Sequence, residues 1–259
     1  MNDYGYKKIV INNLNQIDKS SNNFYSYKKL NFLSKLKKNN NNLIVFFHGA
    51  IPRSQLGKCK IIFRNYNYTI DNTDILCISD HLLGLYDGFT INWGLSTKKC
   101  NVEQDYIELF RYIINHKKYK KIIFSGSSAG GYPSIKYASI FGQICLVGNP
   151  QLYLEKYPSF QTCLVKWLEK YKDKPIYQNN NIEKLILDHK PSKIYLYNNK
   201  KDIHHHTLHV IPFVNFLNVN KLGHILKLVL FEKEIKSKPT HSIPFPIDQI
   251  QIIKNILSS

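Results

Sequence analysis

Cysteine, acidic side chains and long apolar runs are scarce in this sequence, and each scarcity excludes a class of protein. The five cysteines are widely spaced and form no C-x-x-C pair, which argues against a disulfide framework and against a zinc site. No run approaches the ~20 apolar residues of a membrane helix, and residues 1–15 lack the apolar core of a secretory signal. We therefore expect a cytoplasmic protein, with Cys77 and Cys145 as buried thiols.

Acidic residues number only 18 against 36 Lys and Arg, which gives a formal net charge of +18. Residues 1–60 hold eleven basic and two acidic side chains, so half of the excess lies in the first quarter of the chain. A basic surface is either a solvated face or an attraction for anionic partners, such as an acidic glycan, an anionic cosubstrate or a membrane surface. No recognised nucleic-acid motif accompanies the charge, so we expect no specific nucleic-acid binding.

The pattern of apolar residues predicts one α/β domain that spans residues 1–259. Short apolar runs indicate strands at 43–47, 74–79, 121–124, 143–147, 193–197 and 225–231. Helical spacing indicates helices at 102–116, 132–141, 160–171, 182–189, 205–217 and 248–257. Because strands and helices alternate, we expect a mostly parallel sheet with helices on both faces.

Three segments depart from this alternation. Residues 8–12 and 61–68 are expected to be antiparallel edge strands. Residues 150–190 interrupt the strand–helix order, and we expect them to form a small helical cap insertion over the carboxyl edge of the sheet.

The sequence Gly-Ser-Ser-Ala-Gly-Gly at 126–131 is the most informative motif of the chain. It contains G-x-S-x-G between a predicted strand and a predicted helix, which is the context of a nucleophile elbow. Its glycines leave room for a sharp turn, and the start of the following helix favours negative charge near Ser128. A glycine-rich turn that holds a phosphate is the alternative. We predict that Ser128 is a nucleophile.

A nucleophilic serine needs a histidine base, and that histidine needs an acid to orient it. Asp202 follows the predicted strand 193–197, and His241 follows the predicted strand 225–231. Loops at the carboxyl ends of parallel strands collect catalytic groups, and the order Ser, Asp, His is that of α/β-hydrolases. We predict a triad of Ser128, His241 and Asp202, although a turn aspartate and a surface histidine would have the same local sequence.

The oxyanion hole is expected to consist of backbone N–H groups of Ala129, which follows the nucleophile, and of Gly49 and Ala50, which follow an earlier strand. Two roles are open for His48: a structural partner within that loop, or a residue that contacts the substrate. Two roles are also open for Trp93: a residue that lines the pocket, or a residue of the core.

A run of histidines, His204 to His206, is followed closely by His209. His205 and His209 have i,i+4 spacing, which can bind metal on a helix, but the carboxylate and further ligands of an H-E-x-x-H site are missing. We expect no metal. We expect instead that one of these histidines supports the loop of Asp202.

Over about residues 43–259, the chain resembles the α/β-hydrolase superfamily. The residues that carry the resemblance are 47–49, the elbow at 126–131, Asp202 and His241. The Ser-Ser-x-Gly-Gly elbow and the small, lightly capped size are also similar to bacterial capsule-locus proteins of this fold, some of which are polysaccharide O-acetyltransferases that use acetyl-CoA.

The resemblance implies serine-dependent acyl transfer, with a capsular polysaccharide as acceptor and acetyl-CoA as cosubstrate. A carboxylesterase or carbohydrate acetylesterase would use the same triad, because the two reactions differ only in whether water or a sugar hydroxyl accepts the acyl group. A non-catalytic module that binds a polyanion or glycan is the alternative from another class.

Overall fold

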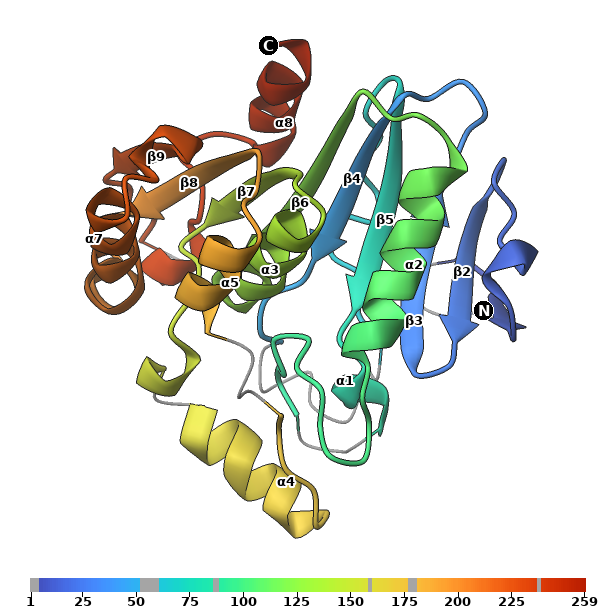
Figure 1. Cartoon of the computed structure of the whole chain (residues 1–259), viewed down its shortest axis with the longest axis horizontal. Coiled ribbons are helices and arrows are strands. Elements are labelled where there is room, and N and C mark those ends of the chain that lie inside the picture. Colours follow the sequence, from blue (N-terminus) through green and yellow to red (C-terminus); the bar gives the residue numbers. More distant parts are fainter. Residues whose placement is uncertain (1–4, 52–60, 86–88, 158–159, 177–180, 237–238) are drawn as a thin grey trace.

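The computed structural model describes residues 5–51, 61–85, 89–157, 160–176, 181–236 and 239–259. Within them a nine-stranded sheet has the order β1-β2-β3-β5-β4-β6-β7-β8-β9 (Figure 1). The strands are β1 Lys8–Ile11, β2 Asn22–Tyr27, β3 Leu30–Lys35, β4 Asn42–Phe47, β5 Thr73–Ser79, β6 Lys121–Ser127, β7 Ile144–Gly148, β8 Lys193–Asn199 and β9 Leu226–Phe231.

The sheet is mostly parallel, as predicted. Only β3 runs against its neighbours β2 and β5, and every other pairing is parallel. The central strands therefore end at one edge, and the loops that carry the predicted site residues follow them there. This arrangement brings together groups that are up to about 200 residues apart in the chain.

Two predictions at the edge of the sheet were wrong. Strand β1 is an edge strand, but it pairs in parallel with β2. Residues 61–68 form no strand: they contain a turn in which Asn65 has φ of 60°, outside the extended range. The hairpin of β2 and β3 was not predicted, because its turn at Lys28 (φ 50°) carries lysines rather than the usual glycine or asparagine.

The described helices cover the two faces of the sheet unequally (Figure 1). Buried side chains of α2, α3, α5 and α7 form one core with the sheet, whereas α8, Phe63 and Ile70 belong to the other. Side chains alternate between the two cores along β4, as the two-residue repeat of a strand requires. The α-helices are α1 Leu82–Leu85, α2 Glu103–His116, α3 Gly131–Ile140, α4 Lys166–Lys170, α5 Ile182–Asp188, α6 Ile203–His205, α7 Ile211–Val219 and α8 Gln249–Ser258.

The region between β7 and β8 contains the predicted insertion. A 3-10 turn at Leu154–Lys156, a π-helix at Phe160–Val165 and the short α4 come first, and α4 lies on the side to which β4 and β5 point (Figure 1). Helix α5 instead packs against the sheet with α3, so only the first part of the region extends beyond the layers.

Cys77 and Cys145 are fully buried in strands β5 and β7, as predicted. None of the helices in the described ranges combines the length and apolar character needed to cross a membrane.

Candidate active site

Ser128 lies directly after β6, in a strained conformation. Its φ is 53°, a left-handed value that a serine adopts only when its surroundings require it. A single 3-10 turn, Ser128–Gly130, leads into α3. The strand, sharp turn and helix therefore have the geometry of a nucleophile elbow, with the Ser128 hydroxyl raised above the end of the sheet.

The glycines of the elbow are required by close packing of the backbone. A Cβ atom on Gly126 would collide with the carbonyl of Gly130. A Cβ atom on Gly130 would lie 2.6 Å from the carbonyl oxygen of Phe47 at the end of β4. The turn is thus pressed against the loop that follows β4, which is where the second oxyanion donor was predicted.

That loop lies beside the nucleophile. A Cβ atom on Gly49 would be 3.6 Å from Cβ of Ser128, and Ala50 lines the same cavity as Ser128. Ala129, the other predicted donor, is fully buried at the start of the turn. The backbone at Ala129 and at Gly49 thus flanks Ser128, where an oxyanion would form.

His48 holds the loop in place. Its Nδ1 donates to the carbonyl of Gly49 (2.6 Å), and its Nε2 accepts from the N–H of Asp80 after β5 (2.9 Å). Burial lowers the pKa of His48, so the ring is neutral at physiological pH. Both ring nitrogens of His48 therefore bond to backbone groups. This favours the first of its two predicted roles, a structural partner within the loop, over a residue that contacts the substrate.

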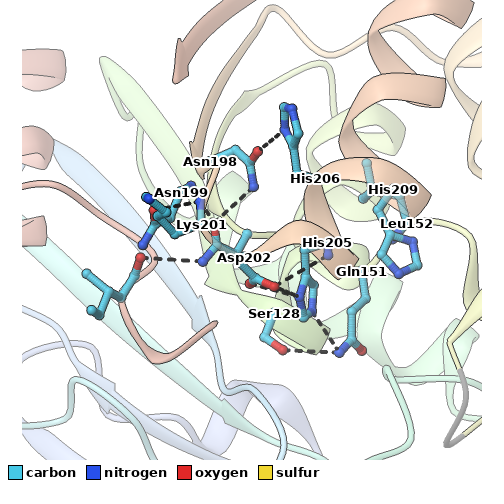
Figure 2. Close-up of polar contacts among 12 residues, drawn as sticks. Ser128, Gln151, Leu152, Asn198, Asn199, Lys201, Asp202, His205, His206 and His209 are labelled. Atoms are coloured by element: carbon cyan, nitrogen blue, oxygen red, sulfur yellow. Dashed lines mark hydrogen bonds and ion pairs between the residues drawn. The ribbon is translucent and has the colours of Figure 1, made fainter. Parts of the chain in front are cut away.

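Asp202 is buried, and its carboxylate holds a histidine on the same turn. Nδ1 of His205 donates to Oδ1 of Asp202 (2.9 Å), and Oδ2 is also 2.9 Å from that nitrogen (Figure 2). Oδ2 has no hydrogen bond of its own within the described residues. The sequence predicted a histidine that supports this loop, and the contact identifies it as His205.

Gln151, which follows β7, joins the nucleophile to this pair (Figure 2). Its Nε2 donates to Oγ of Ser128 (3.2 Å) and lies 3.3 Å from Nε2 of His205. Trp93 donates from Nε1 to Oε1 of Gln151 (2.7 Å), which fixes the orientation of the amide. Because the amide donates, Nε2 of His205 accepts and its proton resides on Nδ1 toward Asp202.

Trp93 is 1% exposed and contacts the site through its hydrogen bond to Gln151. Its ring packs against Tyr157 and Phe160 of the insertion. Trp93 does not line the main cavity, but it lines a small cavity of about 20 Å³ together with Ala129, so both predicted roles, core position and pocket wall, stay predictions.

His209 is fully buried and lies beside His205, near Leu152 (Figure 2). Its Nδ1 accepts from the N–H groups of Leu152 and Tyr153, at 3.3 and 3.2 Å. The rings of His204, His205 and His209 have centroids 5.5–5.8 Å apart, yet no set of three ligands suited to a metal occurs among the described residues. Burial and the neighbouring histidines lower the pKa of His209 to about 3.

His241 lies on a 3-10 turn, Thr240–Ser242, after the last strand. It is exposed and lines the same cavity as Ser128 and Asp202. The backbone next to it is held by Asn149, whose Nδ2 donates to the carbonyl of Ile243 (3.4 Å). The structure thus brings the three predicted triad residues to one cavity, but the hydrogen bond to Asp202 comes from His205.

The cavity has a volume of about 830 Å³ and opens at the carboxyl edge of the sheet. This is within the range of small-molecule sites and far exceeds the volume of an acetyl group. Sequence reasoning missed the Gln151 amide beside the cavity and Arg64 at its wall. It predicted that a histidine supports the loop of Asp202 but did not say which one; a signal for His205 was present, because a buried Asp at a helix start commonly bonds the third residue onward.

No family model matches the chain, and no curated protein matches it. Solved structures do. The capsule O-acetyltransferase of Neisseria meningitidis serogroup A is 15% identical, with a TM-score of 0.61 over 91% of this chain and 94% of that one. The fluorophosphonate-binding serine hydrolase F of Staphylococcus aureus is 13% identical, with a TM-score of 0.54 over 88% and 91%. An esterase of Pyrococcus furiosus is 12% identical, with a TM-score of 0.51 over 88% and 85%.

Identities this low establish the fold and not the reaction. The strand order, the elbow after β6 and the coverage of both chains agree with one another. The chain therefore has the α/β-hydrolase fold, as its sequence motifs predicted.

Proposed function

We propose that this protein is a serine acyltransferase that moves an acetyl group from acetyl-CoA to a hydroxyl of a glycan, through an acyl-enzyme on Ser128. The observation that carries the proposal is the strained Ser128 (φ 53°), raised at the end of β6 beside Gly49 and inside a cavity with Asp202 and four histidines. Strained backbone conformations cluster at active sites, where the surrounding structure holds them in place.

In the proposed reaction, Oγ of Ser128 attacks the thioester carbonyl while a histidine takes its proton. The N–H groups of Ala129 and of the Gly49–Ala50 loop stabilise the oxyanion, and loss of one such donor typically costs ~3 kcal/mol. The thiolate of CoA leaves and takes the proton from the histidine. A glycan hydroxyl then gives its proton to the histidine and attacks the acyl-enzyme, and the histidine returns that proton to Oγ of Ser128 as the ester bond to Ser128 breaks.

We propose His241 as that base, with Asp202 as the acid that orients it. Nε2 of His205 is occupied by the Gln151 amide, which is held at Trp93 and at Ser128. His241 is exposed in the cavity. Oδ2 of Asp202 is buried and lies 2.9 Å from Nδ1 of His205, so the proposal requires this carboxylate oxygen to turn toward His241 when substrate binds. In this account His205 positions Asp202 and Gln151.

The similarity of fold to a capsule O-acetyltransferase, over nearly the whole of both chains, supports a glycan as acceptor. The excess of basic residues supports an anionic donor or acceptor. Carboxylester hydrolysis is the second candidate, because the cavity is open and esterases share the fold.

The test is turnover by purified protein with acetyl-CoA and a panel of polysaccharides. Thiol release that depends on a polysaccharide supports the transferase, and turnover of 4-nitrophenyl acetate without acceptor supports the esterase. In both cases Ser128→Ala should lose at least ~1,000-fold in kcat. Full activity of Ser128→Ala would refute serine catalysis.

A further inference from the structure

The wall of the active-site cavity contains a cation that the proposed chemistry does not use. Arg64 and Asp202 are the residues with a permanent charge among its described lining. The Asp202 carboxylate is bound to His205. The side chain of Arg64 is exposed, and it forms no ion pair with the residues that the structure describes.

The backbone on both sides of Arg64 is fixed. Phe63 is buried in the second core, and the N–H of Ile62 donates to Oγ of Ser79 (3.0 Å). Asn65 donates from Nδ2 to Gln249 of helix α8 (3.3 Å). Because its neighbours are held in this way, the Arg64 side chain starts from a fixed point of the cavity wall.

The charge of Arg64 acts on the loop beside the nucleophile. Burial is the main reason that the pKa of His48 is lowered, and the positive charge of Arg64 lowers it further. His48 holds the carbonyl of Gly49. Arg64, His48 and Ser128 line the same cavity, so the field of the guanidinium reaches the site where the acyl group would be transferred.

We propose that Arg64 binds a phosphate or carboxylate group of a substrate while the acyl group is at Ser128. A guanidinium presents paired N–H donors that match either anion. This proposal rests on the proposed acyltransferase function, and it specifies that a substrate of that reaction is anionic. Two sources share this chemistry: the phosphates of the acyl donor CoA, and acidic groups on the acceptor glycan.

The experiment compares wild type with Arg64→Gln and Arg64→Lys. Arg111→Gln is the matched control, because Arg111 is exposed on α2 and does not line this cavity. The substrates are acetyl-CoA, S-acetylpantetheine, which lacks phosphates, and 4-nitrophenyl acetate, with acidic and neutral polysaccharides as acceptors. Calorimetric binding of CoA and of the acidic polysaccharide to Ser128→Ala protein, with and without Arg64→Gln, measures the site without turnover.

We expect Arg64→Gln to lower kcat/KM by ~10-fold to ~100-fold for the anionic substrate and to weaken its binding in parallel. Arg64→Lys should restore part of the loss, and Arg111→Gln should behave as wild type. A loss with acetyl-CoA but not S-acetylpantetheine assigns the anion to the donor. A loss confined to acidic acceptors assigns it to the acceptor.

Unchanged kcat/KM and binding in Arg64→Gln would overturn the inference, and so would an equal loss for 4-nitrophenyl acetate, which carries no anion. Failure of the proposed function is distinguishable, because wild type would then turn over none of the substrates, while anion binding by calorimetry would still support or refute the role of Arg64.

Discussion

At the residue scale, the side chain of Gln151 bridges His205 and the predicted nucleophile, Ser128. Its amide nitrogen contacts both Oγ of Ser128 and Nε2 of His205, and Trp93 fixes its other end. An amide donates protons but does not shuttle them at neutral pH, so this bridge positions the hydroxyl and occupies the lone pair of His205.

Trp93→Phe should therefore lower kcat several-fold with little change in KM, because it removes the N–H that orients Gln151 while keeping most of the aromatic packing. Gln151→Leu should lower kcat further, since the hydroxyl of Ser128 loses a donor. Steady-state kinetics with 4-nitrophenyl acetate would measure both. The pH profile should keep its shape, as positioning residues do not titrate, and a displaced acidic limb would contradict this role.

Two of the histidines that line the cavity, His205 and His241, are expected to respond differently to substitution. His241→Ala should lose at least ~1,000-fold in kcat, as removal of a general base does. His205→Ala should lose less, because it leaves the base in place and disturbs only Asp202 and Gln151. If single-turnover acylation rates fall more for His205→Ala than for His241→Ala, His205 is the base.

The elbow could be predicted from sequence because steric demands leave a local signature: a serine at positive φ needs glycines beside it. The Gln151 bridge could not, because a glutamine has no spacing rule and its role depends on Trp93, which is 58 residues away in the chain. The contact of Asp202 with His205 spans only three residues of the chain. The order Ser, Asp, His that is typical of α/β-hydrolases instead led to the prediction of His241 as the partner of Asp202.

At the scale of elements, the segment from α6 through α7 connects the histidines to the Gln151 loop. A π-helical turn, His206–Val210, separates the two helices. Pro212 follows that turn and cannot donate the regular helical hydrogen bond to residue 208. Such turns are frequent at functional sites, and this one contains His209, which accepts from the backbone after Gln151.

The buried His209 should make stability depend on pH. Its pKa is lowered to about 3, mainly by burial, whereas an unfolded histidine titrates near ~6.5. Below that value the unfolded chain binds a proton that the folded chain does not, so the free energy of unfolding falls as pH decreases toward 3. The slope from this group approaches ~1.4 kcal/mol per pH unit.

Urea unfolding at pH 7, 6, 5 and 4 would measure this loss. His209→Gln, which keeps an acceptor for the two N–H groups, should reduce the loss between pH 6 and 4. An identical pH dependence in His209→Gln and wild type would show that other groups, such as the buried His48 and His81, account for it.

Elements with strong periodicity were predicted well. Helix α2 and strands β4 to β9 lie near their expected positions. Helix α2 and strands β4 to β8 bury apolar side chains, and β9 continues the apolar pattern although its side chains are only partly buried. The edge of the sheet was predicted poorly. Residues 61–68 have the aromatic content of a strand, but Ile62 packs into one core and Phe63 into the other, and neither residue pairs within the sheet.

At the scale of the whole molecule, the net charge of +18 should accelerate the encounter with anionic substrates. We predict that kcat/KM for acetyl-CoA or an acidic glycan falls several-fold as NaCl rises from about 10 to about 300 mM, because salt screens this attraction. The neutral ester 4-nitrophenyl acetate should show little change. Equal salt dependence for neutral and anionic substrates would contradict a steering role for the charge.

The central claim is that the strained Ser128 at the end of β6 is a nucleophile. The most direct measurement is labelling of the folded protein with a fluorophosphonate, followed by mass spectrometry of the modified peptide. We predict one label on Ser128, lost in Ser128→Ala and kept in Ser127→Ala. A folded protein that takes no label, or takes it at another residue, would contradict the account.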